Sequence, residues 1–337
     1  MRRGGALIGL MLLAACSGGA EREPYVQSRT PANLAERFYP PEGWAWGLVQ
    51  VGDAPPQRYG VSAPATTPWA QILILPDYGE TAETWFETAS NLNDRGYTVW
   101  VLDAAGQGGS GRLARPRDLG HADSFAPDIA AVRAIAKVII RPGATSPLFI
   151  LGHGVGAVTA ARAAETGAPT AGLILSAPAF SQQAGAEVTA YHLFGLGRRR
   201  LPGTTGWRRD DEKVGLDLDP WRAGVTHAWQ TANPDLRMGG PSLDWAAAYD
   251  LAASEARRDF KSVDAETLVV AAAPDCAALP HCSAVAIAAG PRALELARNE
   301  PRDAWLAAID TFIRQQLAPP TPDASQPGAA PIASRQP

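Results

Sequence analysis

The hexapeptide Leu151-Gly152-His153-Gly154-Val155-Gly156 decides the fold, because it joins an apolar strand to an alanine-rich helix. The strand is expected over residues 147–151 and the helix over residues 157–166. Glycines at both outer positions let strand and helix approach closely around a sharp turn. The central residue, Gly154, takes a strained backbone that glycine accepts without steric cost. The hexapeptide therefore predicts a tight strand–turn–helix unit.

Strand-like and helix-like runs alternate on both sides of this unit. Further apolar strands are expected at residues 71–75, 98–102, 172–175 and 267–270, with antiparallel strands at 44–51 and 58–61. Helices are expected over residues 82–95, after a capping Ser124, and from Pro301 onward. Buried strands that alternate with helices predict an α/β fold with a mostly parallel sheet covered on both faces. The alternation stops between Ser176 and Thr267, which predicts a helical cap inserted over about residues 180–260.

The start of the chain has the pattern of a targeting segment. Arg2 and Arg3 precede a short apolar run at residues 6–15, and the sequence Leu13-Ala14-Ala15-Cys16 follows. This tetrapeptide resembles the bacterial lipobox, whose cysteine becomes the lipidated first residue; the alternative is an ordinary signal peptide with an incidental cysteine. We expect a signal peptide at 1–15, a tether at 16–32, and a membrane anchor on Cys16 in the cell envelope, facing the periplasm or in the outer membrane.

The composition limits which kinds of structure and partner the rest of the chain can have. The 337 residues are 46% hydrophobic, which is enough for a large core, and residues 33–317 are expected to form one domain. Residues 318–337 are rich in proline and predict a disordered tail. The formal charge of -4 excludes the basic surface that nucleic acid requires. Beyond the leader, the sequence contains no apolar run long enough to predict a membrane-spanning helix.

Two cysteines remain besides Cys16. Cys276 and Cys282 lie close together, and in an exported protein such a pair favours a small disulfide loop. Two free thiols, or a zinc site completed by Asp275 and His281, are the alternatives. One tight loop rarely offers tetrahedral zinc ligation, so no metal and no cofactor are expected.

Four segments in this order resemble the monoacylglycerol lipase and lysophospholipase branch of the α/β-hydrolases. They are the hexapeptide in the place of the nucleophile elbow G-x-S-x-G, residues 103–111 (DAAGQGGSG), residues 176–178 (SAP) and residues 233–245 (NPDLRMGGPSLDW). The resemblance covers about residues 68–317. It implies an α/β-hydrolase fold with a cap and, in active members, a catalytic triad of serine, histidine and an acid.

The chain departs from this branch at the residues that carry the chemistry. Gly154 stands at the nucleophile position, and the histidine position falls near Ala293, in the segment 290–294 (GPRAL). By resemblance, Asp275 is the triad acid that remains. The oxyanion-hole segment is 76–80 (PDYGE) instead of H-G-x-G-E, so its backbone donors would be Tyr78 and Val155.

Other residues could substitute for the missing nucleophile and base. The candidate bases are His153 and His281, and the candidate relocated nucleophiles are Ser176 and Ser110; for each, a structural role is the competing interpretation. The remaining histidines are expected to be surface or cap residues: His121, His192 and His227. Cap arginines at 198–200 and 208–209 predict either a solvated face balanced by acids at 210–212 or contact with anionic lipid headgroups.

Three hypotheses follow from these observations. The first is a catalytically inactive pseudohydrolase, anchored to a membrane, that binds a lipid-like ligand or an envelope partner protein. The second is a carboxylic-ester or acylglycerol hydrolase (lipase or lysophospholipase) with a relocated catalytic constellation. The third is a structural envelope protein with a filled pocket. A pocket lined by packed aromatic residues would favour the third, and an open, mostly apolar cleft under the cap would favour the first two. A polar cluster in that cleft would favour the second.

Overall fold

A computed structural model describes residues 24–181, 195–210, 217–287 and 292–318. The signal peptide with Cys16, His192, the acids at 211 and 212, and the tail beyond residue 318 lie outside this description. Among the described residues, no helix is both long and apolar enough to cross a membrane.

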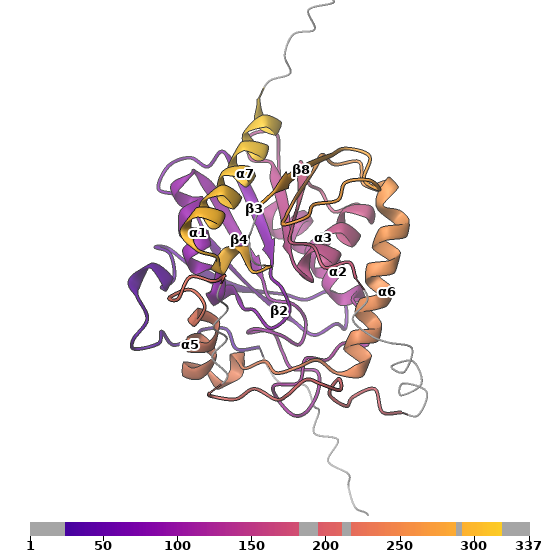
Figure 1. Cartoon of the computed structure of the whole chain (residues 1–337). Helices are drawn as coiled ribbons and strands as arrows, with labels where there is room; N and C mark the ends of the chain where they lie inside the picture. Colours follow the sequence, from indigo (N-terminus) through magenta and orange to yellow (C-terminus); the bar gives the residue numbers. More distant parts are fainter. Residues whose placement is uncertain (1–23, 182–194, 211–216, 288–291, 319–337) are drawn as a thin grey trace, which may run out of the picture.

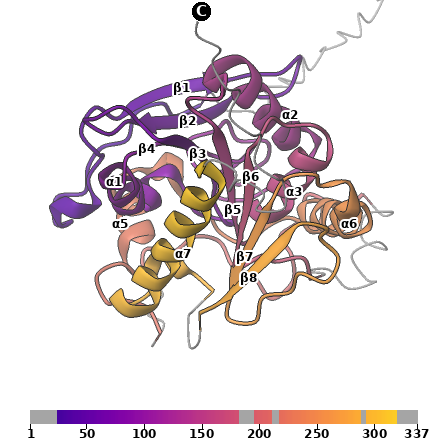
Figure 2. The same cartoon turned by 90° about the horizontal axis from the view of Figure 1, so that it is seen from above.

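The strands form one eight-stranded sheet (Figure 1). Their order is β1-β2-β4-β3-β5-β6-β7-β8, which can be followed from above in Figure 2. Their bounds are β1 Ala45–Val49, β2 Gln57–Ser62, β3 Ala70–Leu75, β4 Tyr97–Leu102, β5 Leu148–His153, β6 Gly172–Ser176, β7 Thr267–Ala271 and β8 Cys282–Ala286. β1 and β2 are antiparallel to their neighbours and β3 to β8 are parallel. In the centre of the sheet, Ile150 pairs with both Leu73 and Leu173. Strands in this position are buried on both faces, which explains why their sequences are continuous apolar runs.

Helices cover both faces of the sheet, as the alternating pattern predicted (Figure 2). Their bounds are α1 Phe86–Asp94, α2 Ala126–Ala134, α3 Gly156–Glu165, α5 Val225–Ala232, α6 Leu243–Asp259 and α7 Asn299–Leu317. α1 and α7 cover one face, where Trp85 and Trp305 are fully buried. α2, α3 and α6 lie on the other face. Ser124 does not cap α2 as expected, because the helix begins one residue later, with Phe125 at its N-cap.

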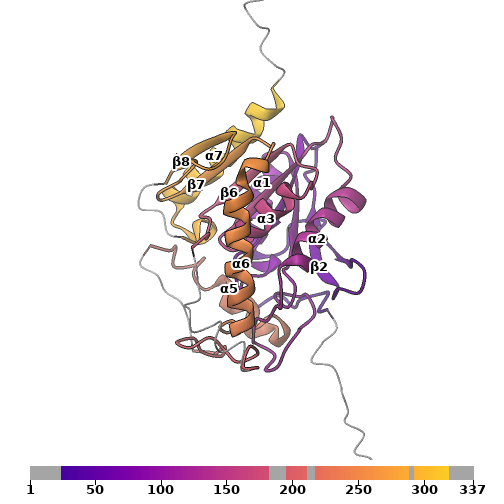
Figure 3. The same ribbon diagram turned by 90° about the vertical axis from the view of Figure 1, so that its right-hand side faces the viewer.

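The insertion between β6 and β7 contains α5 and α6. α6 runs alongside α3, and its Trp245 and Tyr249 pack on Phe125 and Val155 (Figure 3). Trp229 of α5 packs on Phe86 at the start of α1. The aromatic residues of the insertion therefore fasten it to the body at two separate places beside the C-terminal ends of the strands.

Candidate functional site

The turn between β5 and α3 has the geometry of a nucleophile elbow. Gly154 has φ +55°, a left-handed conformation that glycine adopts without strain. A Cβ on Gly156 would collide with the backbone carbonyls of Leu75 and Pro76, so the helix passes directly over the end of β3. The hexapeptide thus folds as predicted, with position 154 at the apex of the turn.

The carboxylate of Asp77 occupies the space above this apex. Its Oδ1 accepts hydrogen bonds from the backbone amides of Val155, at 2.7 Å, and Tyr78, at 2.8 Å. These are the two amides expected to form the oxyanion hole. A Cβ built on Gly154 would overlap the Asp77 carboxyl group. One acidic side chain therefore fills both the place of a nucleophile and the place of a developing oxyanion.

Arg292 completes this arrangement from the segment after β8. Its Nη2 lies 3.2 Å from Oδ2 of Asp77, and its side chain is 53% exposed. Arg292, one residue before the approximate histidine position, therefore reaches the site, whereas Ala293 at that position is the N-cap of the short helix Leu294–Leu296. Asp275 is exposed, and its carboxylate accepts a bond from the amide of Ala277 in its own loop. Within the described residues, no contact joins Asp275 to Arg292.

A buried charged cluster lies behind the elbow. His153 Nε2 is 2.9 Å from Glu295 Oε2, and Glu80 Oε2 accepts the amide of Asp77 and the indole NH of Trp85. Burial alone would lower the pKa of His153, but the carboxylates of Glu295 and Glu80 raise it to about 9. Burial and the Glu295 carboxylate raise the pKa of Glu80 well above its usual value. His153 is therefore protonated at neutral pH and is unable to act as a general base.

Among the described residues, two hydrogen-bonded serine–histidine pairs each face a carboxylate: one lies buried directly behind the elbow, and the other ends at the exposed Asp123. Ser176 Oγ is 3.0 Å from Nδ1 of His153, whose other nitrogen faces Glu295. Ser242 Oγ is 2.9 Å from Nδ1 of His121, whose Nε2 lies 3.3 Å from Asp123. Both serines are 0% exposed.

Each of these serines has a structural partner. Trp305 donates its indole NH to Ser176, and Ser242 accepts the amide of Trp245 as the N-cap of α6. Ser110 likewise bonds the backbone of Arg58 and Asp103 in the core. None of the three residues lines the pocket described below.

The other sequence candidates lie away from the elbow. The sulfurs of Cys276 and Cys282 are bonded to each other, which leaves no thiolate for a metal. His281 is exposed in the same loop, and His227 stacks on Trp207. In the cap, Arg200 pairs with Asp118 at 3.1 Å.

Two groups of described residues bring potential metal ligands together. The first is Glu80, His153 and Glu295, and the second is His121, Asp123 and Asp244. In the first group His153 and Glu295 already form a buried ion pair, and the second includes the partly exposed pair between His121 and Asp123. Both groups fit structural ion pairing.

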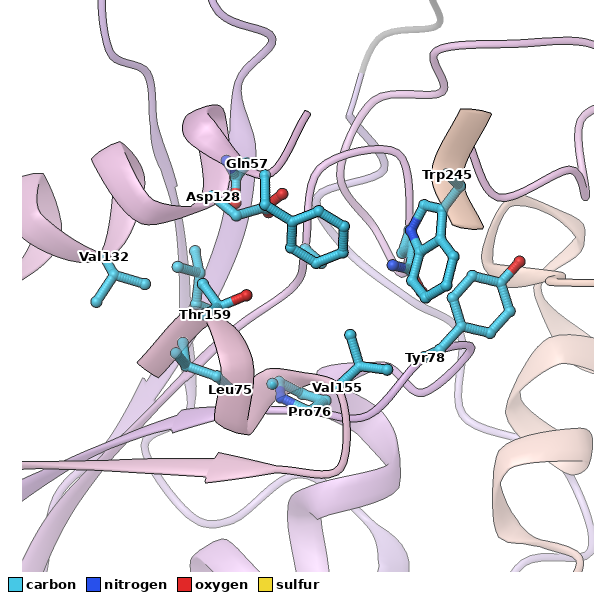
Figure 4. Close-up of a pocket in the computed structure, with 14 residues that line it drawn as sticks. Gln57, Leu75, Pro76, Tyr78, Asp128, Val132, Val155, Thr159 and Trp245 are labelled. Atoms are coloured by element: carbon cyan, nitrogen blue, oxygen red, sulfur yellow. The ribbon is translucent and has the colours of Figure 1, made fainter. Parts of the chain in front are cut away.

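A narrow pocket opens beside the filled oxyanion hole (Figure 4). Its cavity volume is about 30 Å³. Tyr78 and Val155 line one side of it, with Trp245 of α6 and Phe125 beside them. Gln57, Asp128 and Thr159 lie on the opposite side. No local sequence pattern singles out Gln57 and Asp128, although both are polar residues within otherwise buried elements.

The comparisons with known proteins agree with this architecture. A family model described as "Serine aminopeptidase, S33" (Hydrolase_4) matches residues 66–292, which is more than half of the chain. The chain belongs to this α/β-hydrolase family. It is 26% identical to Lysophospholipase L2 of Escherichia coli strain K12 over 209 residues, 55% of this chain and 57% of that protein. The chain thus spans little more than half the length of the curated relative that it matches.

Solved structures share the family fold. A monoglyceride lipase from Saccharomyces cerevisiae, solved with a substrate analogue, has a TM-score of 0.60 and 15% identity, covering 88% of this chain and 99% of its own. A lipase in an open form has a TM-score of 0.62 and 15% identity, covering 81% of this chain and 99% of its own. Because the identities are low, these likenesses show the fold of the S33 family alone.

Proposed function

We propose that this member of the family is a catalytically inactive hydrolase that binds a lipid-like ligand at a membrane of the cell envelope. The observation that carries the proposal is the Asp77 carboxylate above Gly154, held by the amides of Tyr78 and Val155. Acyl transfer by a triad needs a nucleophile, a base and an empty oxyanion hole. In this site glycine replaces the nucleophile, an arginine stands near the histidine position, and a carboxylate fills the hole.

The Asp77 carboxylate opposes acyl transfer on electrostatic grounds as well. A tetrahedral intermediate develops negative charge at the oxyanion, and a fixed carboxylate there repels it and consumes its hydrogen-bond donors. The ion pair with Arg292 holds the carboxylate in place. Residual triad-like catalysis is therefore not expected from the elbow.

Ligand binding does not need the missing groups. The pocket beside the elbow keeps aromatic walls from Tyr78, Trp245 and Phe125. A lysophospholipid or monoacylglycerol is the ligand class that the named relative and the structural neighbours favour.

The anchor is the second part of the proposal. Acyl chains on Cys16 would hold the domain next to lipid, and exposed cap residues such as Arg198 and Arg199 would face anionic headgroups or an envelope partner protein. A Cys16→Ala variant is expected to appear in the soluble fraction without acyl chains by mass spectrometry. Soluble wild-type protein that begins at another residue would refute the anchor.

The alternative is an acylglycerol or carboxylic-ester hydrolase with a relocated constellation. The full burial of Ser176 and Ser242 weighs against it, because a buried hydroxyl bonded to an indole or to a helix N-terminus is not available to attack an ester.

Turnover and binding assays separate the two proposals. Wild-type protein is tested with a fluorogenic ester panel and a fluorophosphonate probe, and with monoacylglycerol in a binding titration. We expect no turnover, no covalent labelling and saturable binding. Turnover abolished by Ser176→Ala or Ser242→Ala would establish the alternative instead.

A pocket variant ties the binding to the proposed site. Ala104 lines the pocket and is partly exposed, so Ala104→Trp would place a ring in the cavity. Ala307 is exposed on α7, which makes Ala307→Trp a matched control. Binding is expected to fall at least tenfold in the first variant only. Equal affinity in both variants would contradict binding in this pocket.

A further inference from the structure

The inner side of the pocket carries three hydrogen-bonding side chains from three different elements. Gln57 comes from β2, Asp128 from α2 and Thr159 from α3, and Figure 4 shows them grouped across the pocket from Tyr78 and Trp245. An acyl chain would gain nothing from these groups, because burying polar atoms against methylenes is unfavourable. This side of the pocket therefore requires a different part of the ligand.

Asp128 is a buried carboxyl group without a cationic partner. Its residue is 6% exposed, and its Oδ1 accepts the amide of Ala105 at 2.7 Å. No lysine, arginine or histidine among the described residues forms an ion pair with it. Burial raises the pKa of Asp128 to about 6, so the group is still ionised at neutral pH. Buried charges in proteins are normally paired, and this one faces a cavity instead.

Gln57 adds an acceptor that lacks a donor. The residue is 1% exposed, and its Nε2 donates to the carbonyl of Pro127 at 3.2 Å. That bond fixes the amide orientation, because the reversed amide would set two oxygens against each other. Its Oε1 is buried with no hydrogen-bond partner. A buried orphan acceptor beside a cavity indicates that a donor is supplied by whatever enters.

The opposite wall is aromatic. The rings of Tyr78 and Trp245 lie 4.6 Å apart, centroid to centroid, and those of Phe125 and Trp245 lie 5.7 Å apart. Aromatic faces attract cations through their quadrupole. Among the described residues that line the pocket, none carries a positive charge.

From this geometry we infer that the pocket binds a primary ammonium group, with Asp128 as its counter-ion and Gln57 Oε1 and Thr159 Oγ1 as further acceptors. An ammonium group has three donors and no acceptor, which matches the three side chains. A quaternary ammonium has no N–H donor, and its bulk does not suit a narrow cavity. The inference deepens the proposed function by naming the polar head of the ligand, either a free amine or the head group of an aminolipid.

Calorimetric titration of the full-length protein tests the inference. The free probes are propylammonium, neutral propanol and tetramethylammonium. The lipid probes are lysophospholipids in mixed micelles with ethanolamine or choline head groups and the same acyl chain. We expect the primary ammonium of each set to bind at least tenfold more tightly than its analogues. A preference in both sets assigns the site to the ammonium itself, and a preference in the lipid set alone assigns it to the aminolipid head group.

Asp128→Asn is the decisive variant, because it keeps the shape of the side chain and removes the charge. It is expected to abolish the preference for the primary ammonium, whereas Asp264→Asn, at an exposed carboxylate, is expected to keep it. Thr159→Val gives a second, nearly isosteric test and should weaken the preference. Far-UV circular dichroism and thermal melts verify that each variant folds.

The absence of a preference for the primary ammonium in both probe sets, or an unchanged preference in Asp128→Asn, would overturn the inference. If monoacylglycerol still binds the wild type in that case, the proposed function stands and this inference alone fails. Conversely, ammonium preference without binding of any acyl lipid would retain the inference and refute the proposed ligand class.

Discussion

A methyl group at position 154 is expected to destabilise the protein through two separate effects. In Gly154→Ala the residue keeps φ near +55°, which costs about 1–2 kcal/mol for a residue with a Cβ. The new Cβ also overlaps the carboxyl group of Asp77, which must leave the amides of Tyr78 and Val155. Hydrogen bonds to a charged group contribute about 1.5–3 kcal/mol each. Since the Asp77 side chain is 18% exposed, water replaces part of that loss.

A double-mutant cycle separates the two effects. In an Asp77→Gly background the collision is absent, so Gly154→Ala should cost only the backbone strain. We expect the single variant to lose about 3–5 kcal/mol of unfolding free energy, and the coupling between positions 77 and 154 to be about 2–3 kcal/mol.

Urea denaturation followed by circular dichroism measures all four proteins of the cycle, with thermal melts as an independent check. Ala307→Gly, at an exposed position of α7, serves as a control that should not couple to Asp77. If the costs at 77 and 154 add within about 0.5 kcal/mol, the Asp77 carboxylate does not occupy the space above the elbow, and the argument for a filled oxyanion hole fails.

Three further predictions follow from the same geometry. The pKa of His153 is raised from 6.5 to about 9, so its ion pair with Glu295 should stabilise the fold by up to about 3 kcal/mol below pH 6.5. This stabilisation should be lost as the pH rises through 9. In Glu295→Gln the urea midpoint should depend less on pH over that range. Gly154→Ser alone should stay unreactive to a fluorophosphonate. Only the triple variant with Asp77→Gly and Arg292→His has a nucleophile, an open oxyanion hole and a base. Labelling of the single variant would contradict this prediction. Thiol reagents should leave Cys276 and Cys282 unlabelled in unreduced, denatured protein, and labelling of both would show that the disulfide is absent in solution.

The sheet was the most predictable part of the fold. Strands such as residues 71–75 and 172–175 are short apolar runs bounded by turn residues, and their burial on both faces leaves little choice of structure. Helix starts were less predictable, because Ser124 has the side chain of a cap and the backbone begins the helix after Phe125 instead.

The candidate site was predictable only in what it lacks. The sequence alone shows that position 154 has no nucleophile, and that an acid stands at position 77 in the oxyanion-hole segment. It does not show that the acid turns back onto the amides of Tyr78 and Val155. Likewise, Gln57 and Asp128 are 71 positions apart in the chain, and nothing local to either residue indicates a shared pocket.

By itself, the sequence determined the α/β sheet and the glycine elbow, because hydrophobic periodicity and glycine placement act over a few neighbouring residues. Tertiary structure alone decided what fills the site. Asp77 follows β3, Gly154 follows β5 and Arg292 follows β8, and parallel strands bring their C-terminal ends together at one edge of the sheet. The hydrogen bonds, ion pair and excluded volume at this edge arise between residues far apart in the chain, and only the packed sheet sets their distances.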